Sequence, residues 1–413
     1  MNKSIYIYFD DAFTAEPVMV GLLSSQQIRG HEVFSFEFSS EWLHDSHCHL
    51  LDPDLQLFSG RQYLQEEKSN FGLFLDSSPD RWGRVLLDRR ESHRAREEKR
   101  DAVTLQESDY MLGVFDESRM GALRMKLSPD GDFLDNDINY STPPFTSLRE
   151  LEDAVSKLEQ DDDTINSRWL QMLVAPGSSL GGARPKANVK DTKGNLWIAK
   201  FPSHKDKLNV GSWEAVTMKL AKSCNINVAP FETKALANVY STFLTRRFDR
   251  TDTGKRIHFT SAMTMLGYSD GKTEGCSYLE LFDWINSHCC NVEENLAEMW
   301  RRIVFNIAVS NCDDHLRNHG FLLTEHGWVL SPAYDLNPSE YGDGLSLNIN
   351  ERDNALDYAL ALEIAPFAGI SESVAKQIIQ RTKDVVSQWR SLATSYHISR
   401  DEQEIMSKAF RVK

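Results

Sequence analysis

Residues 311–320 constrain this 413-residue chain more than any other part of its sequence. They place Asp313 and Asn318 in an Asp-x-x-x-x-Asn spacing, and Asp335 follows after an apolar segment that predicts a strand. Phosphotransferases use such a set: one Asp orients or deprotonates the attacking hydroxyl, while an Asn and a second Asp hold Mg²⁺ on the nucleotide phosphates. Oxygen ligands suit that hard cation. The spacing therefore predicts a fold that brings these three side chains to one polar cleft.

A loop rich in glycine and serine lies upstream, at residues 176–186, and contains Gly181 and Gly182. Glycine lets backbone N–H groups approach phosphates closely, and this loop lacks the Gly-Lys-Ser/Thr ending of a Walker A loop. The predicted strand that follows ends in Lys200, and Glu214 in the next predicted helix is placed to pair with that lysine. A strand lysine after a Gly-rich loop holds the nucleotide phosphates in kinases. The order of these residues predicts a kinase that uses ATP and Mg²⁺.

The same motifs carry a family resemblance. Ser-Leu-Gly-Gly-Ala-Arg-Pro-Lys, Ile-Ala-Lys-Phe-Pro, Arg-Arg-Phe-Asp-Arg, Asn-Cys-Asp-Asp-His-Leu-Arg-Asn-His-Gly and Pro-Ala-Tyr-Asp-Leu occur in that order, and together they resemble the HipA family. Its members are the kinase toxins of bacterial type II toxin–antitoxin systems. Segments 79–84 and 119–124 resemble the N-terminal domain of the family, so the resemblance covers nearly the whole chain.

The resemblance implies an α+β fold, protein-kinase-like and two-lobed, with a small mixed α/β lobe, a larger helical lobe and an extra N-terminal, mainly-β subdomain. We expect residues 1–145 to form the HipA-type N-terminal subdomain with small-lobe elements. Residues 146–250 would form the small lobe, with the Gly-rich loop and the nucleotide lysine. Residues 251–413 would form the helical lobe with the catalytic and Mg²⁺-binding residues. The arginine-rich segment 81–100 has interspersed acids, which predicts a solvated, salt-bridged helix and not a nucleic-acid surface.

Carried over position by position, Asp313 resembles the catalytic aspartate of the family. Asn318 and Asp335 resemble the Mg²⁺ ligands, and Lys200 resembles the lysine that contacts the nucleotide. The roles that the resemblance implies for these four residues agree with those that their chemistry and order predict.

Further residues of the family's nucleotide site also have counterparts. Ser179 matches the loop serine that such kinases autophosphorylate, with Ser178 beside it. Phe248 lies in a stretch that resembles the hinge that meets adenine, and a backbone contact there would tolerate Arg246, where family members can carry an acidic residue. His315 is a further candidate for nucleotide binding, and we also expect it to support the catalytic loop.

The resemblance supplies the expected biology and partners. It implies a growth-arresting toxin controlled by a helix-turn-helix antitoxin of the HipB type, which also binds operator DNA, so this chain would meet DNA only indirectly. A protein substrate is implied, an aminoacyl-tRNA synthetase being a known kind in the family. Two alternatives stay open. One is a small-molecule or lipid kinase, because Asp-x-His-x-x-Asn also fits residues 313–318. The other is a nucleotide-binding corepressor without catalysis.

Composition limits the kinds of partner and the cellular compartment that we expect for this chain. The chain has 46 Lys and Arg against 61 Asp and Glu, a formal net charge of −15, which disfavours autonomous binding to a phosphate backbone. No apolar run nears the length of a membrane helix. The six cysteines include no Cys-x-x-Cys pair, which indicates reduced thiols. We therefore expect a cytoplasmic protein with no membrane contact.

Overall fold

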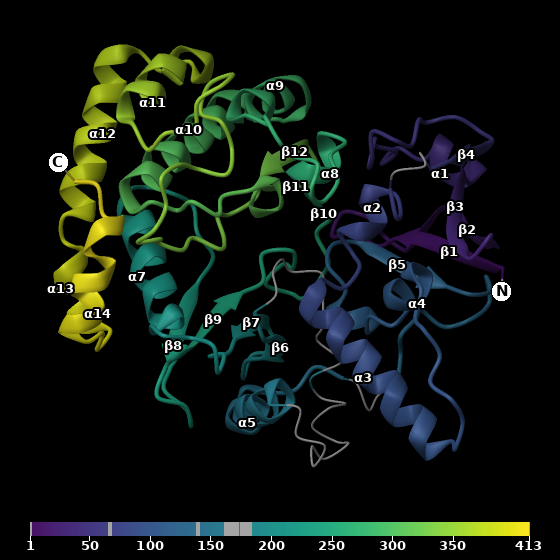
Figure 1. The fold of residues 1–413 in the computed structure, drawn as a ribbon. Coiled ribbons are helices and arrows are strands. Elements are labelled where there is room, and N and C mark those ends of the chain that lie inside the picture. The colour runs from purple at the N-terminus through teal and green to yellow at the C-terminus, as the bar shows by residue number, and fades with distance from the viewer. Residues whose placement is uncertain (1, 65–67, 138–140, 161–172, 174–183, 413) are drawn as a thin grey trace. The chain divides into compact units, whose positions relative to one another are not determined.

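The structure is a computed structural model that describes residues 2–64, 68–137, 141–160, 173 and 184–412. Figure 1 colours the fold along the chain. Contacts divide the chain into two compact units: unit 1 consists of residues 1–204 and 246–260, and unit 2 consists of residues 205–245 and 261–413. The three-part division at residues 145 and 250 stays a prediction.

Unit 1 contains a five-stranded antiparallel sheet in the order β4-β3-β2-β1-β5. Its strands are β1 (Lys3–Phe9), β2 (Val18–Ile28), β3 (His31–Phe38), β4 (Arg61–Tyr63) and β5 (Leu123–Lys126). Ile5, Ile7 and Phe9 alternate along β1 and are fully buried, so one face of the sheet packs on a core. At Gly21 in β2, a Cβ atom would collide with the backbone carbonyl of Glu37, so this close approach of β2 and β3 requires glycine.

Helices and a further hairpin complete unit 1. The helical segments are α1 (Ser40–His44), α2 (Gly72–Leu75), α3 (Arg81–Glu97), α4 (Glu107–Leu112), η1 (Asp116–Ser118), η3 (Phe145–Ser147) and α5 (Leu148–Glu159). On α3 and the turn after it, Arg94 pairs with Glu98 and Arg100 pairs with both Glu98 and Glu91, which confirms the predicted salt-bridged helix. The antiparallel hairpin is formed by β6 (Lys186–Lys190) and β7 (Leu196–Lys200).

Unit 2 is mainly helical. Its helical segments are α7 (Val210–Ser223), α8 (Ala262–Met265), α9 (Tyr278–His288), α10 (Val292–Val309), η4 (Leu316–Asn318), α11 (Tyr358–Ile364), η5 (Ala365–Ala368), α12 (Glu372–Val386), α13 (Trp389–Ser395), α14 (Arg400–Met406) and η6 (Ser407–Ala409). The strands of this part of the chain are β8 (Phe231–Lys234), β9 (Thr242–Arg246), β10 (Phe259–Ser261), β11 (Gly320–Thr324) and β12 (Gly327–Leu330). The β11–β12 hairpin lies where the sequence predicts one apolar strand between Asn318 and Asp335.

The core of unit 2 is built around α7 and α10. The rings of Trp389 and Phe410 stack at 4.4 Å between centroids, and Trp213 of α7 lies 6.0 Å from each. Seven consecutive residues at the C-terminal end of α10, residues 303–309, are buried, although one of them is the polar Asn306. A helix buried on all sides is held rigidly, so α10 gives the loop that follows it a fixed starting point.

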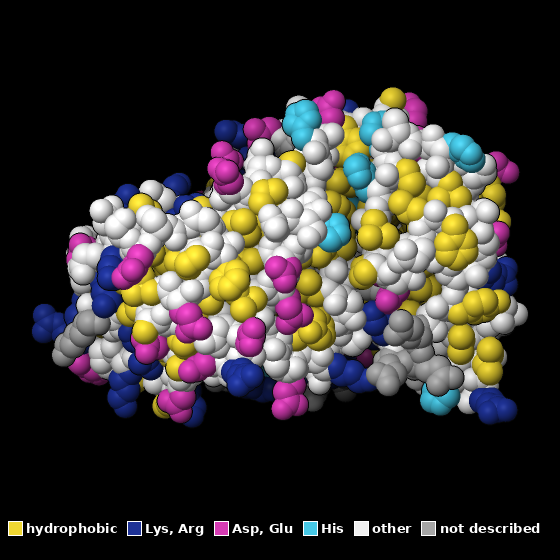
Figure 2. All heavy atoms as spheres, turned by 90° about the horizontal axis from the view of Figure 1, so that it is seen from above, with side chains coloured by type: hydrophobic (Ala, Val, Ile, Leu, Met, Phe, Trp, Pro, Cys, Tyr) yellow, Lys and Arg dark blue, Asp and Glu magenta, His cyan; other side chains and the backbone are white. Residues whose placement is uncertain are grey.

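The surface carries charges of both signs. In Figure 2, acidic and basic side chains are interspersed on the face shown, with hydrophobic side chains scattered among them. All six cysteines are free thiols. Within the described part of the chain, no helix combines the length and the apolar character that a membrane span requires.

Candidate active site

The loop that carries Asp313 begins with a sharp turn at the end of α10. Ser310 adopts a left-handed backbone conformation with φ 50°, and the N–H of Asn311 donates to the carbonyl oxygen of Asn306 at 2.9 Å. The Ser310 hydroxyl donates to the carbonyl oxygen of Ala409 at 2.8 Å. These contacts fix the direction in which the chain leaves the helix, and therefore the position of the loop.

Asp313 and Asn318 are joined by a short local hydrogen bond. The side-chain nitrogen of Asn318 donates to the backbone carbonyl oxygen of Asp313 at 2.7 Å, and Asn318 is only 5% exposed. The single 3-10 turn η4 brings the two residues together, with the N–H of Asn318 donating to the carbonyl oxygen of His315 at 2.8 Å. Because its amide nitrogen is engaged, Asn318 presents its amide oxygen as the atom available to a cation.

The segment around Asp335 is tied to the same loop. The Tyr334 hydroxyl donates to the carbonyl oxygen of Arg317 at 2.6 Å, and the N–H of Ser339 donates to the carbonyl oxygen of Ser310 at 3.1 Å. Asp335 itself has a left-handed backbone with φ 57°, which is uncommon outside glycine and is held here by these flanking contacts. Its carboxylate accepts a hydrogen bond of 3.0 Å from the Asn337 side chain.

Electrostatics show that Asp313 and Asp335 act on one another. The pKa of Asp313 is raised, first by partial desolvation and then by the carboxylates of Asp335 and Asp314, while His315 opposes the shift. A cation bound between two carboxylates that repel each other in this way would reduce the repulsion. Carboxylate and amide oxygens are the ligands that Mg²⁺ prefers, so the Asn318–Asp335 pair fits that ion. In the described residues, no group of three or more His, Cys, Asp or Glu side chains forms a metal site.

Asp314, which the sequence reasoning did not single out, anchors the loop from beneath. It is 1% exposed, and one of its carboxylate oxygens accepts three hydrogen bonds. The donors are Asn306 of α10 at 2.6 Å, the His319 ring at 2.9 Å and the Tyr278 hydroxyl of α9. Burial, followed by the charge of Asp314, raises the pKa of Tyr278 well above its usual value, so the phenol keeps the proton that it donates. A polar Asn306 within an apolar helical run was the sequence signal for this network.

The Asp314 network explains why the neighbouring Asp313 can face solvent. A buried carboxylate with three donors is fully compensated, and it fixes the backbone of its own residue. Asp313 lies in the turn just before Asp314, and its side chain is exposed where that of Asp314 is buried. His319 contacts Asp314 and so supports the same loop. His315 is half-buried, and its Nδ1 has no hydrogen-bond partner in the described residues.

The remaining predicted residues lie in several parts of the chain. Lys200 is the last residue of β7 in unit 1, opposite Lys186 in the hairpin register. Phe248 lies in the 246–260 segment of the same unit, where its ring is 5.9 Å from that of Phe259. Glu214 lies in α7 of unit 2 and is 3% exposed.

Unit 2 thus brings together Asp313, His315, Asn318 and Asp335. Ser179, Gly181 and Gly182 lie outside the described residues, as does Ser178. The roles of all these residues stay predictions.

Comparison with known proteins identifies the family and the fold. The family of the HipA-like C-terminal domain matches residues 178–389, more than half of the chain. The serine/threonine-protein kinase toxin HipA of Shewanella oneidensis is 28% identical over 228 residues, 47% of this chain and 50% of that protein. The putative kinase Y4dM of Sinorhizobium fredii is 26% identical over 216 residues, 48% of this chain and 52% of that protein. The chain thus spans about half the length of these curated relatives.

The solved complex of Shewanella oneidensis MR-1 HipA, HipB and operator DNA contains a chain with a similar structure. The TM-score is 0.66 at 18% sequence identity, and the match covers 98% of this chain and 94% of that one. This similarity confirms the predicted α+β, kinase-like fold. Because the HipA-like C-terminal family matches more than half of the sequence and the fold agrees over nearly all of it, this chain belongs to the HipA family.

Proposed function

We propose that this chain is a HipA-like toxin kinase, which transfers the γ-phosphoryl group of ATP to a serine or threonine hydroxyl of a protein and so arrests growth. The observation that carries the proposal is the arrangement in unit 2. One loop presents exposed Asp313, the Asn318 amide nitrogen is engaged by the Asp313 carbonyl so that its oxygen stays available, and Asp335 is close enough to raise the pKa of Asp313. Kinases use this combination of carboxylates and an amide for phosphoryl transfer.

Each residue has one proposed task. The Asp313 carboxylate orients the attacking hydroxyl and accepts its proton as the oxygen bonds to the γ-phosphorus and the bond to the β-phosphate oxygen breaks. Asn318 and Asp335 hold Mg²⁺, which when bound neutralises phosphate charge. Lys200 holds the nucleotide phosphates, with Glu214 as its proposed partner and Phe248 beside the adenine. Positioning and electrostatics supply most of the catalysis in such reactions.

Partners and regulation are proposed on the strength of the relatives. The Shewanella oneidensis HipA structure is a complex with HipB and operator DNA. By analogy, a helix-turn-helix antitoxin would neutralise this chain and link it to DNA, while the net charge of −15 disfavours direct DNA binding. Autophosphorylation of Ser179, a protein substrate such as an aminoacyl-tRNA synthetase, and a cytoplasmic location of this chain belong to the same proposal.

Phosphate transfer from radiolabelled ATP tests the activity directly. The purified chain, incubated with ATP, Mg²⁺ and a cell extract, should label itself or a protein of the extract. Asp313→Ala should remove the label, whereas Asp283→Ala, which alters an exposed aspartate of α9, should not. No label on either the unmodified chain or the proteins of the extract, or equal labelling by Asp313→Ala, would contradict the proposal.

A small-molecule or lipid kinase is the second candidate, and one observation favours keeping it. His315 completes an Asp-x-His-x-x-Asn pattern, and its Nδ1 has no hydrogen-bond partner in the described part of the chain. The radiolabel distinguishes the two candidates, because it would appear in the small-molecule or lipid fraction and not in protein. A nucleotide-binding corepressor would bind ATP without any transfer.

A further inference from the structure

Unit 1 contains a pocket of about 220 Å³ that none of the proposed catalytic or nucleotide-binding residues lines. One wall is the turn that joins β6 to β7, and the other is the segment 246–254 that follows β9. Lys193 lies on the first wall, and Thr251 and Thr253 lie on the second. Lys200 and Phe248 do not contribute to the lining, although Arg246 and Arg247 of the pocket belong to the stretch that resembles the adenine hinge.

The lining is strongly cationic in an otherwise acidic protein. Two acidic side chains, Glu117 and Asp252, face five basic ones. The basic residues are Lys190, Lys193, Arg246, Arg247 and Arg250. A chain with a net charge of −15 that concentrates positive charge at one small cavity creates a local potential that attracts anions.

The two acidic side chains of the pocket form exposed ion pairs, which a bound anion can replace. Asp252 pairs with Arg246 at 2.6 Å, yet the Asp252 side chain is 88% exposed. Glu117 pairs with Lys190 at 2.5 Å and is 42% exposed. Ion pairs at this level of exposure are weak and screened, so a doubly charged anion can displace both carboxylates. The Lys193 ammonium forms no hydrogen bond or ion pair with the described residues.

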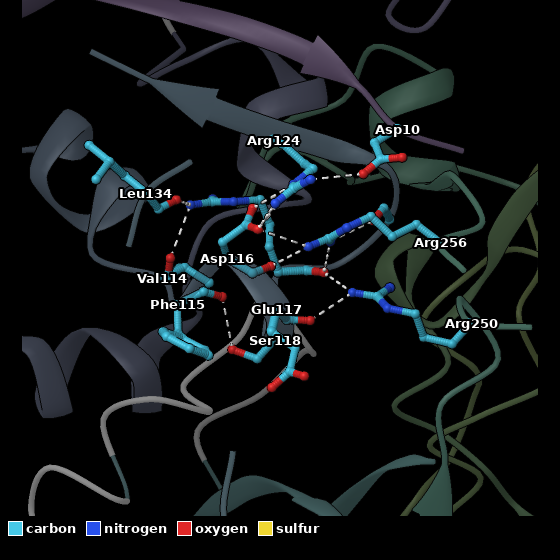
Figure 3. Close-up of polar contacts among 12 residues, drawn as sticks. Asp10, Val114, Phe115, Asp116, Glu117, Ser118, Arg124, Leu134, Arg250 and Arg256 are labelled. Atoms are coloured by element: carbon cyan, nitrogen blue, oxygen red, sulfur yellow. Dashed lines mark hydrogen bonds and ion pairs between the residues drawn. The ribbon is translucent and has the colours of Figure 1, made fainter. Parts of the chain in front are cut away.

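Buried arginines stand behind the pocket. Arg247 and Arg250 share the fully buried carboxylate of Asp249, and their remaining N–H groups donate largely to backbone carbonyl oxygens. Figure 3 shows the continuation of this cluster, where Arg256 and Arg124 converge on Asp116 and Arg250 donates to the carbonyl oxygen of Glu117. The carbonyl oxygens satisfy the N–H donors of the guanidinium groups, but they do not neutralise the positive charge.

The arginines accordingly repel one another. Burial, followed by the charges of Arg256 and Arg247, lowers the pKa of Arg250 to about 9 even though Asp249 opposes the shift. Burial also lowers the pKa of Arg119 to about 10, with Arg256 contributing in the same direction. An anion in the adjoining pocket would stabilise this cluster, because it would supply negative charge next to Arg250.

We propose that this pocket binds a phosphate-type dianion, either inorganic phosphate or the phosphate group of a small monoester. Ammonium, guanidinium and hydroxyl donors reach it from two walls, which suits a tetrahedral group with several acceptor oxygens better than a planar carboxylate with two. Sites for drug-sized ligands measure roughly 300–1,000 Å³, so the smaller volume favours a small anion over a whole nucleotide.

Binding of phosphate to the full-length protein tests the proposal. Isothermal titration with inorganic phosphate, and separately with glycerol 3-phosphate, is carried out at constant ionic strength set with chloride. Either anion should bind at one site, and the tighter of the two identifies the source of the phosphate group. Lys193→Glu should weaken binding about tenfold or more, because it reverses the one charge on the lining without a partner in the described residues. Arg246→Gln should also weaken it.

Two control variants check that the anion binds in this pocket and not elsewhere on the chain. Lys99→Glu reverses the charge of an exposed lysine of unit 1 outside the pocket and should leave phosphate affinity unchanged. Lys200→Ala should leave it unchanged too, because Lys200 does not line the pocket. No binding at 10 mM phosphate, equal affinity for acetate, or binding that Lys200→Ala removes and Lys193→Glu does not, would each overturn the proposal.

Discussion

The side-chain amide nitrogen of Asn318 donates a 2.7 Å hydrogen bond to the backbone carbonyl oxygen of Asp313. This bond fixes the orientation of the amide, so that the nitrogen points into the loop and the oxygen remains for a ligand. One turn of the chain therefore fixes the relative positions of Asn318, the proposed cation ligand, and Asp313, the proposed catalytic carboxylate. Tertiary hydrogen bonds of Tyr334 and Ser339 then hold the segment that carries Asp335 against this loop.

Replacing Asp313 or Asp335 by alanine should reduce phosphoryl transfer by about 1,000-fold or more, because proton acceptance or cation binding is lost. Asp313→Ala should not lower the melting temperature, since that side chain is exposed and Asp335 is relieved of repulsion, whereas Asp335→Ala should lower it slightly because it loses the bond from Asn337 and places alanine at φ 57°. Radiolabel transfer and thermal denaturation of the same preparations check both statements. Substantial transfer by the double variant would refute the assignment of the active site.

Asp314→Ala should destabilise the fold by about 3 kcal/mol or more, because it leaves the buried donors of Tyr278, Asn306 and His319 without their shared acceptor. Urea denaturation measures the change in the free energy of unfolding. Asp283→Ala, at an exposed site on α9, should change it by less than about 0.5 kcal/mol. Similar values for the two variants would mean that the network contributes little.

The pH dependence of stability should contain a contribution from Asp52, which is 1% exposed. Burial raises its pKa from 3.8 to about 7, although the N–H groups of Leu73 and Asp54 donate to it. The folded state therefore holds a proton that the unfolded state has lost between about pH 4 and pH 7. Stability from this group is present at low pH and falls as the pH rises through that window, by up to about 4 kcal/mol.

Asp52→Asn should flatten this slope, because the amide does not titrate. Urea denaturation of the two proteins at several values between pH 4 and pH 8 gives the difference in slope. Asp283→Asn, at an exposed aspartate of α9, serves as the control and should leave the slope as it is. Parallel profiles for Asp52→Asn and the unmodified chain would show that Asp52 is ionised in the folded state throughout.

ATP with Mg²⁺ should raise the melting temperature of the chain. A ligand that binds only the folded state stabilises it by about 2.7 kcal/mol at a hundredfold excess over its Kd. Lys200→Ala should remove much of the shift, because Lys200 is the proposed contact to the phosphates. Thermal denaturation with and without millimolar ATP and Mg²⁺ measures this, and an unchanged melting curve for the unmodified chain would count against nucleotide binding.

Ser179 should become phosphorylated when the active chain is incubated with ATP and Mg²⁺. A phosphate there adds about −1.5 to −2 charges, which would compete with the phosphates of the nucleotide and lower its affinity. Mass spectrometry should find the modification in the unmodified chain and not in Asp313→Ala. Active protein with no phosphate on Ser178 or Ser179 would rule out this form of regulation and leave the kinase proposal standing.

Local sequence predicted several elements well. The helix α3 lies where residues 81–100 predict it, and the strand β7 ends at Lys200 as expected. Asp80 caps the start of α3 by accepting a hydrogen bond from the N–H of Gly83, and β7 pairs with its neighbour β6 in a hairpin, so both elements depend mainly on neighbours in sequence. The relation of Asp313 to Asn318 is equally local, because one short turn closes it.

The sequence by itself thus determined the family, the type of fold and the chemistry expected around Asp313. Only the tertiary structure decided which residues hold the loop around Asp313 in position. The donors to Asp314 come from Tyr278 and Asn306 on two helices, and the cationic pocket combines turns that are far apart in the chain. The physical reason is that a buried charge is tolerated only where partners compensate it, and where distant segments supply those partners, no pattern of neighbouring residues records which segments will meet.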